Sequence, residues 1–311
     1  GVMINGNYSD VAFNTRSVAE ISNVAGNELI SVLTSGSENK NLNYNYNVNG
    51  NYRFADTSGH ELTLDLDYGY FNSDRKSYQP NTYFFSDNTT ESRYYRNITP
   101  SEIHIYSIKT DYTTPLAGGV LSGGLKSAYV ETDNAFRFYN IEENTDIYDS
   151  ARSNQFIYKE TIHAAYLNYQ FSFKDFEFQA GVRSEYTISE GDLNSVQVTL
   201  DENVKRDYLD FFPSAGVTWK MNKKNTLGFV YSSRIDRPNY QDLNPFEWRL
   251  DELSYRKGNP FLNPQYSHKF EITHSYNYAI STSASYSRTD DYFAQVTDTI
   301  EGNKSFMTSK N

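Results

Sequence analysis

Several acidic side chains are spaced so that they could act in pairs. Asp65 and Asp67 lie two residues apart and share one face of an extended strand, as do Glu177, Arg183 and Glu185 further along. Two carboxylates on one face can serve as general acid and general base in hydrolysis. The same arrangement is typical of any strand whose polar side faces water. We therefore predict no catalytic residues and expect that the protein is not an enzyme.

The chain has five histidines, and none stands at metal-ligand spacing from another histidine or from a carboxylate. We therefore predict no metal site and no cofactor. His163 and His274 lie on strands that the polarity pattern predicts. Either ring therefore remains open as the base of a hydrolase that pairs histidine with serine or aspartate.

Aromatic side chains crowd the longest connecting segment of the chain. Rings exposed in a loop offer contact area at low entropic cost, so they stack well on sugars, peptides and other amphipathic ligands. The alternative is that these rings pack on one another and close the loop over the molecule. The candidate ligand-binding rings are Tyr240, Phe246, Trp248 and Tyr255.

Composition limits the kind of molecule that positions these residues. The 311 residues include 28 tyrosines, 20 phenylalanines and 2 tryptophans, yet 38% of the chain is hydrophobic and the mean hydropathy is -0.70. This is too little aliphatic content for a helical core and too many rings for a disordered chain. The net charge of -11 excludes a nucleic-acid partner bound through a basic surface. The absence of cysteine excludes disulfides and thiolate metal sites.

A period of two in polarity predicts long strands. Between residues 41 and 54 apolar side chains occupy nearly every even position and asparagine nearly every odd one. Residues 60–71 repeat the pattern after a turn at 56–59, so the two segments form a hairpin. Roughly ten to twelve segments fit this pattern. Residues 1–40 are the least readable part, and a helical turn, a loop or a short strand all remain open for 15–35.

The connections between these segments alternate between short and long. Tight turns near 56–59, 115–119 and 174–175 are interleaved with excursions such as 74–101 and 134–159. Outer-membrane barrels have this asymmetry, with short periplasmic turns and long extracellular loops. Strands of about 9 to 11 residues suffice to cross a bilayer. We therefore predict an all-β fold: an antiparallel up-and-down transmembrane β-barrel portion, roughly ten to twelve strands of a larger barrel. Its apolar side chains would contact outer-membrane lipid and its polar side chains the lumen.

Four motifs follow one another late in the chain. They are F-P-S at residues 212–214, R-I-D-R-P at 234–238, L-N-P-F at 243–246 and G-N-P-F-L-N-P at 258–264. Their prolines cannot donate a ladder hydrogen bond, so they belong at strand ends or in a shaped loop. In this order the motifs resemble the outer-membrane β-barrel family of TonB-dependent receptors.

The resemblance implies a receptor of the Gram-negative outer membrane. In such receptors an N-terminal plug domain fills a barrel of about 22 strands, and the inner-membrane TonB complex drives uptake of a bound nutrient. We expect residues 1–311 to be a single β-barrel portion from which the plug domain and the C-terminal strands are absent. Contact with the TonB complex would run through those missing regions. A portion of this kind has free sheet edges.

Arg234 adds one charged residue to the candidate ligand site. It shares a strand face with Gly228, Val230 and Ser232, which points its guanidinium towards the lumen. There it pairs with a lumen carboxylate or faces a ligand or plug.

The sequence thus predicts the barrel part of a TonB-dependent outer-membrane receptor that binds and imports an unknown nutrient ligand. Two alternatives stay open. An outer-membrane barrel hydrolase needs a lumen or rim histidine within hydrogen-bond reach of a serine or aspartate. A soluble β-sheet adhesion module would pack the apolar face of residues 62–70 on a second sheet instead of on lipid.

Overall fold

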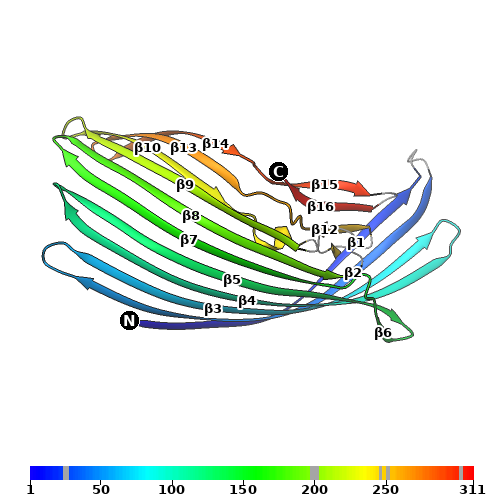
Figure 1. Cartoon of the computed structure of the whole chain (residues 1–311). Helices are drawn as coiled ribbons and strands as arrows, with labels where there is room; N and C mark the ends of the chain where they lie inside the picture. The colour runs from blue at the N-terminus through cyan, green and yellow to red at the C-terminus, as the bar shows by residue number, and fades with distance from the viewer. Residues whose placement is uncertain (24–27, 197–202, 245–246, 250–252, 301–303) are drawn as a thin grey trace.

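The computed structural model shows a long, strongly curved antiparallel sheet (Figure 1). It describes residues 1–23, 28–196, 203–244, 247–249, 253–300 and 304–311. Within these residues the sheet has twelve strands, and β10 pairs with β13 across a long connection. The strands are β1 (Val2–Ser22), β2 (Leu29–Ala55), β3 (Glu61–Phe85), β4 (Thr90–Leu116), β5 (Gly119–Glu142), β6 (Thr145–Tyr148), β7 (Asn154–Phe173), β8 (Phe176–Ser195), β9 (Asn203–Lys220), β10 (Asn225–Asp236), β13 (Gln265–Tyr276) and β14 (Ile280–Asp290).

Antiparallel pairing of neighbours throughout this sheet confirms the predicted up-and-down order. The short β6 pairs with β5 and lies off the main path. β1 and β14 form the two ends of the sheet and, within the part of the chain that the structure describes, do not pair with each other. The sheet is therefore an open wall with two free edges, and the edge strand β1 is 21 residues long.

The two ends of the strands carry different connections. At the end drawn on the left in Figure 1, tight turns join the strands, with left-handed backbone at Gly59, Gly118, Lys174 and Asn277. At the opposite end the connections differ widely in length, from residues 143–144 between β5 and β6 to residues 237–264 between β10 and β13. The long connection from β10 to β13 agrees with the longer extracellular loops of outer-membrane barrels.

The strands reach further towards the extracellular end than the sequence pattern predicts. Residues 74–101 were expected as a loop, but β3 continues to Phe85 and β4 begins at Thr90, so most of that segment is strand. The same correction applies to 134–159, where β5 continues to Glu142 and β7 begins at Asn154. Within 15–35, the described residues belong largely to β1 and β2, so the helical turn left open there is not formed.

The connection between β10 and β13 folds back inside the curve of the wall. It contains the short helix α1 (Tyr240–Leu243) and the strands β11 (Glu247–Arg249) and β12 (Ser254–Lys257). Together with β15 (Ala294–Ile300) and β16 (Lys304–Lys310) these two strands form a second, four-stranded sheet, in which β12 pairs with β16 in parallel. In the described part of the chain, no helix is both long and apolar enough to cross a membrane.

The convex face of the wall is apolar and uncovered. Leu66 of β3 lies opposite Ile108 of β4, and these side chains remain 48% and 47% exposed. Tyr52 on β2 is 56% exposed. Rings form a cross-strand row in which the centroids of Tyr68 and Tyr106 lie 5.0 Å apart, as in the aromatic girdle of an outer-membrane barrel. The described residues thus lack the covering sheet that the adhesion alternative requires.

The best-packed apolar cluster lies on the inner face of the wall. Tyr95 of β4 and Phe136 and Phe138 of β5 are buried together, and the ring centroids of Tyr95 and Phe138 are 5.2 Å apart. The guanidinium of Arg152 covers the Phe138 ring at 4.8 Å. These residues stand beyond the apolar outer band, so this buried cluster lies in the extracellular half of the lumen.

Candidate functional site

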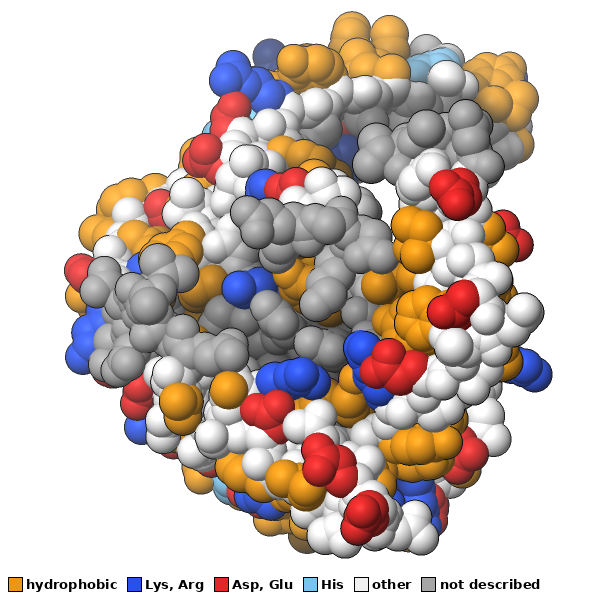
Figure 2. All heavy atoms as spheres, turned by 90° about the vertical axis from the view of Figure 1, so that its right-hand side faces the viewer, with side chains coloured by type: hydrophobic (Ala, Val, Ile, Leu, Met, Phe, Trp, Pro, Cys, Tyr) orange, Lys and Arg blue, Asp and Glu red, His pale blue; other side chains and the backbone are white. Residues whose placement is uncertain are grey.

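A cavity of about 680 Å3 lies between the inner face of β2 to β5 and the folded-back connection. We call it the lumen chamber. Figure 2 views the molecule from the extracellular end and shows the hollow that the sheet encloses. The wall side of the chamber is lined by Asn41, Asn43, Asn45, Phe71, Ser73, Arg75, Thr99, Ser101, Ile103 and Asn134. The connection supplies Tyr240, Asn244, Arg256 and Gly258.

Alternation along β2 places its asparagines in this chamber. Odd positions of β2 face inwards, so successive asparagines stand about 7 Å apart on one face. Ser73 donates to Asn41 Oδ1 at 3.1 Å, and Asn43 donates to Ser9 Oγ at 3.3 Å. An asparagine side chain offers two N–H donors and two lone pairs. These bonds therefore orient the amides while leaving hydrogen-bonding capacity towards the chamber.

Arg75 stands where the lumen chamber meets a second cavity of about 200 Å3. Its guanidinium lies over the Phe13 ring, 5.5 Å from the centroid. Burial lowers the pKa of Arg75, but an arginine remains protonated near neutral pH. The smaller cavity is lined by Phe13, Thr15, Ser37, Asn39, Arg75, Ser77, Gln79, Asn97, Thr99 and Phe136.

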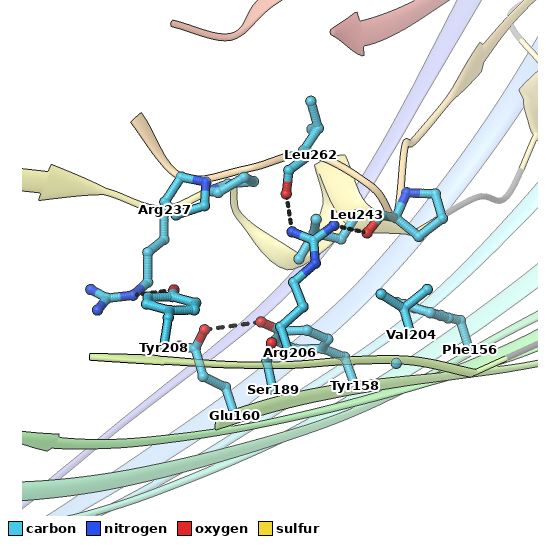
Figure 3. A pocket seen from close by; sticks show the side chains of 14 residues that line it. Phe156, Tyr158, Glu160, Ser189, Val204, Arg206, Tyr208, Arg237, Leu243 and Leu262 are labelled. Atoms are coloured by element: carbon cyan, nitrogen blue, oxygen red, sulfur yellow. Dashed lines mark hydrogen bonds between the residues drawn. The ribbon is translucent and has the colours of Figure 1, made fainter. Parts of the chain in front are cut away.

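An ion pair fixes the start of the folded-back connection to the wall. Arg237 donates from Nη2 to Glu185 Oε2 at 2.7 Å and to Thr187 Oγ1 at 2.8 Å, and from Nε to Tyr208 Oη at 3.1 Å (Figure 3 shows Arg237 beside Tyr208). Burial by itself lowers the pKa of Arg237, but Glu185 and Tyr208 outweigh burial and raise it. The guanidinium therefore stays charged and holds the connection against β8 and β9.

A second arginine holds the far end of the same connection. Arg206 of β9 donates to the backbone carbonyls of Leu262 and of Pro260, the latter at 2.8 Å (Figure 3). Leu262 is fully buried. Tyr158 lies in the same pocket, and its hydroxyl donates to Glu160 at 2.9 Å. Burial raises the pKa of Tyr158, and the carboxylate of Glu160 raises it further. The folded-back connection is thus held at both ends. Its residues Tyr240, Asn244, Arg256 and Gly258 form the inner wall of the lumen chamber.

The predicted ligand-binding residues have different positions. Tyr240 lines the lumen chamber. Tyr255 is buried and stacks on Phe306 at 5.5 Å, so its ring packs between strands of the second sheet. Trp248 contributes backbone pairing with Arg256. Phe246 lies outside the described residues.

Arg234 lies on the inner face of β10 and is exposed, as predicted from its position on the strand. A pair between Arg234 and a lumen carboxylate stays a prediction. Among the described residues, the guanidinium that pairs with Glu185 from this motif is that of Arg237. Contact of Arg234 with a ligand stays a prediction.

The histidines and paired acids do not assemble a hydrolytic site on the inner face. His163 lies 3.0 Å from Ser127 Oγ, but both side chains are on the convex, lipid-facing side of the wall. In the described residues no carboxylate hydrogen-bonds to His163, so this pair lacks the acid that orients a catalytic histidine. His274 binds the Asn225 side chain at 3.0 Å. Across the segments that the structure describes, no cluster of metal-ligating residues occurs.

Arg75 was not predicted as a site residue, and the asparagines were predicted only as a polar strand face. The sequence feature that could have identified the asparagines as chamber residues is their regular spacing between residues 39 and 51. Nothing local in the sequence showed that Tyr240, Asn244, Arg256 and Gly258 would lie opposite that spacing.

Comparisons with known proteins agree with this geometry. The copper transporter OprC has a TM-score of 0.53 at 10% identity, with 100% of this chain and 57% of that one covered. The hemophore receptor HasR of Serratia marcescens was solved as a double mutant with its hemophore HasA and heme. It has a TM-score of 0.52 at 10% identity, with 98% of this chain and 58% of that one covered. These likenesses concern the fold, and the chain spans less than two thirds of either structure. A search of curated proteins found no match.

The open antiparallel wall, its exposed apolar face and its polar lumen define a β-barrel protein of the Gram-negative outer membrane, with the barrel fold of a TonB-dependent receptor. Residues 52–311 match the outer membrane protein beta-barrel family, and the chain belongs to this family.

Proposed function

We propose that this chain forms the wall and the ligand chamber of a TonB-dependent receptor that binds a nutrient at the cell surface and imports it. The observation that carries the proposal is the lumen chamber itself. It lies in the extracellular half of the barrel, and its volume of about 680 Å3 falls within the range of about 300 to 1,000 Å3 of sites that hold small molecules.

The free edges of β1 and β14 support a larger barrel. Every backbone amide within hydrocarbon needs an internal partner, so an open edge does not persist in a bilayer. Further strands of the same protein would close the wall, and a plug domain would fill it on the periplasmic side. Energy from the TonB complex would then act through that plug.

Nutrient depletion tests this function while the ligand is still unidentified. Three strains grow in the same rich medium: wild type, a deletion of the receptor, and a deletion of the energy-coupling TonB protein. Mass spectrometry of the spent medium should find one or more compounds that both deletion strains leave behind. If the receptor deletion consumes the same compounds as wild type, the proposal is wrong.

A further inference from the structure

A row of asparagines on β2 runs through both the lumen chamber and the smaller cavity beside it. Asn39 lines the smaller cavity, and Asn41, Asn43 and Asn45 line the chamber. The four residues alternate along one face of the strand, so their amides repeat about every 7 Å over about 20 Å. The row therefore offers a line of neutral donors and acceptors that passes from one cavity into the next.

The rest of the polar lining is also mainly neutral. Carboxamides and hydroxyls of the neighbouring strands face the two cavities, from Ser73, Ser77, Gln79, Asn97, Thr99, Ser101 and Asn134. Among the described residues that line either cavity, none is aspartate or glutamate.

The arginines of this lining are engaged within the chain. Arg256 donates from Nη2 to Asp242 Oδ1 at 2.8 Å. Arg75 lies over the Phe13 ring, 5.5 Å from its centroid, and makes a further interaction. The groups that the lining presents to a ligand are therefore chiefly neutral amides and hydroxyls.

One buried acceptor of the smaller cavity lacks a donor. Asn97 is 6% exposed, and no group in the described part of the chain donates to its Oδ1. Asn39 beside this cavity differs, because its Nδ2 donates to Ser37 Oγ at 2.9 Å. A buried acceptor without a donor costs free energy, so Asn97 Oδ1 points to a molecule in the cavity that supplies the donor.

We propose that the two cavities together bind a neutral oligosaccharide, with a sugar hydroxyl donating to Asn97 Oδ1. Sugar hydroxyls donate and accept hydrogen bonds, as do side-chain amides, and a linear chain of sugars repeats these groups along its length as the asparagine row does. The rings of Phe71 and Tyr240 supply apolar area on which the faces of sugar rings pack. This inference rests on the proposed function, since it names the ligand class of the same site.

A charged ligand fits this lining less well. Burying a charge without a partner is strongly disfavoured. A cationic ligand needs a carboxylate, which the described lining of the two cavities lacks. A multiply charged metal chelate needs several available cations, whereas Arg256 already pairs with Asp242.

The test measures binding to the purified full-length receptor in detergent by titration calorimetry. The probes are linear trisaccharides of glucose, mannose, galactose and xylose, the uronic-acid counterparts of the hexose trisaccharides, and ferric citrate as a multiply charged chelate. We expect at least one neutral trisaccharide to bind more tightly than every uronic-acid probe and more tightly than ferric citrate.

Asn97→Leu separates a binding role from a structural one. Leucine has a similar size but no acceptor, so the variant should weaken the best trisaccharide about 2- to 12-fold, the loss expected for one hydrogen bond between neutral groups. Because Asn97 Oδ1 has no donor among the described residues, the thermal midpoint of the unliganded receptor should stay the same or rise. Unchanged affinity, or a lower midpoint, would contradict the proposed role.

A matched pair of asparagine variants tests the row without touching Asn97. Asn45→Leu should weaken the same trisaccharide by a similar factor, because Asn45 lines the chamber. Asn51→Leu is the control, since Asn51 lies on the same face of β2, about 20 Å further towards the periplasmic end and outside the described lining of both cavities. Its affinity should stay within about twofold of wild type, and equal losses in the two variants would refute the placement of the ligand.

The outcomes separate this inference from the proposed function. Tighter binding of a uronic-acid probe or of ferric citrate overturns the neutral-saccharide assignment while a receptor remains. The absence of binding by every neutral trisaccharide also overturns it. The proposed function is judged independently by the depletion experiment, in which no ligand class is assumed.

Discussion

Replacing Arg237 with glutamine should release the folded-back connection from the wall. The side chains of Arg237 and Glu185 are 18% and 9% exposed, so their bond is shielded from solvent. The substitution removes a charged donor to Glu185, Thr187 and Tyr208, and a hydrogen bond to a charged group contributes about 1.5 to 3 kcal/mol. Because Arg183 also pairs with Glu185, that carboxylate is not left alone.

The net loss of docking free energy is therefore about 2 to 3 kcal/mol, which raises the undocked population roughly 30- to 150-fold. Hydrogen exchange reports on the connection at the backbone amide of Asn259, which donates to the Asp242 carbonyl within the connection and becomes open to solvent when the connection leaves the wall and unfolds. Exchange there should accelerate by the same factor in Arg237→Gln. Arg234→Gln is the control, because Arg234 is exposed and three residues away. Unchanged exchange in Arg237→Gln, or an equal acceleration in the control, would refute the anchoring role.

Three further substitutions test other parts of the structure. Arg206→Gln removes the donors to the Pro260 and Leu262 carbonyls, so residues 258–264 should become sensitive to limited proteolysis while the strands stay intact. Leu66→Arg places a cation on the lipid face and should lower the free energy of unfolding from vesicles by about 2 to 4 kcal/mol, and a loss below about 0.5 kcal/mol would contradict its position. His163→Ala should leave ester hydrolysis by the purified protein at background, as in wild type, and a hydrolytic activity that this variant abolishes would support the hydrolase alternative.

Alternation alone made most of the wall predictable. The period of two in residues 41–54 and 60–71 recurs as the register of β2 with β3, in which Tyr46 lies opposite Tyr70. The extracellular extensions were not predictable as strands, because beyond the bilayer both faces are polar or mixed and the alternation weakens. Residues 15–35 were unreadable for the same reason, because their described part lies where β1 ends and β2 begins, at the extracellular end of the wall.

The site was predictable only in part. Tyr240 was a candidate from its place in an aromatic loop, and it lines the chamber. The lumen chamber was missed because it forms only where a segment more than 160 residues from Arg75 folds back inside the wall. The pair of Arg237 with Glu185 was not predicted, because it depends on where β10 ends and the sequence pattern does not locate a strand end to one residue.

The most direct test of the two-faced wall is a cysteine scan of β3, which is straightforward because the chain has no native cysteine. Spin labels are attached one at a time from Leu62 to Tyr70 in the receptor reconstituted in vesicles, and their collision with oxygen and with a water-soluble nickel complex is measured. The structure predicts a period of two: labels at even positions collide mainly with oxygen dissolved in lipid, and labels at odd positions mainly with the nickel complex. Equal access of the nickel complex to both sets would contradict a wall with one lipid face and one lumen face.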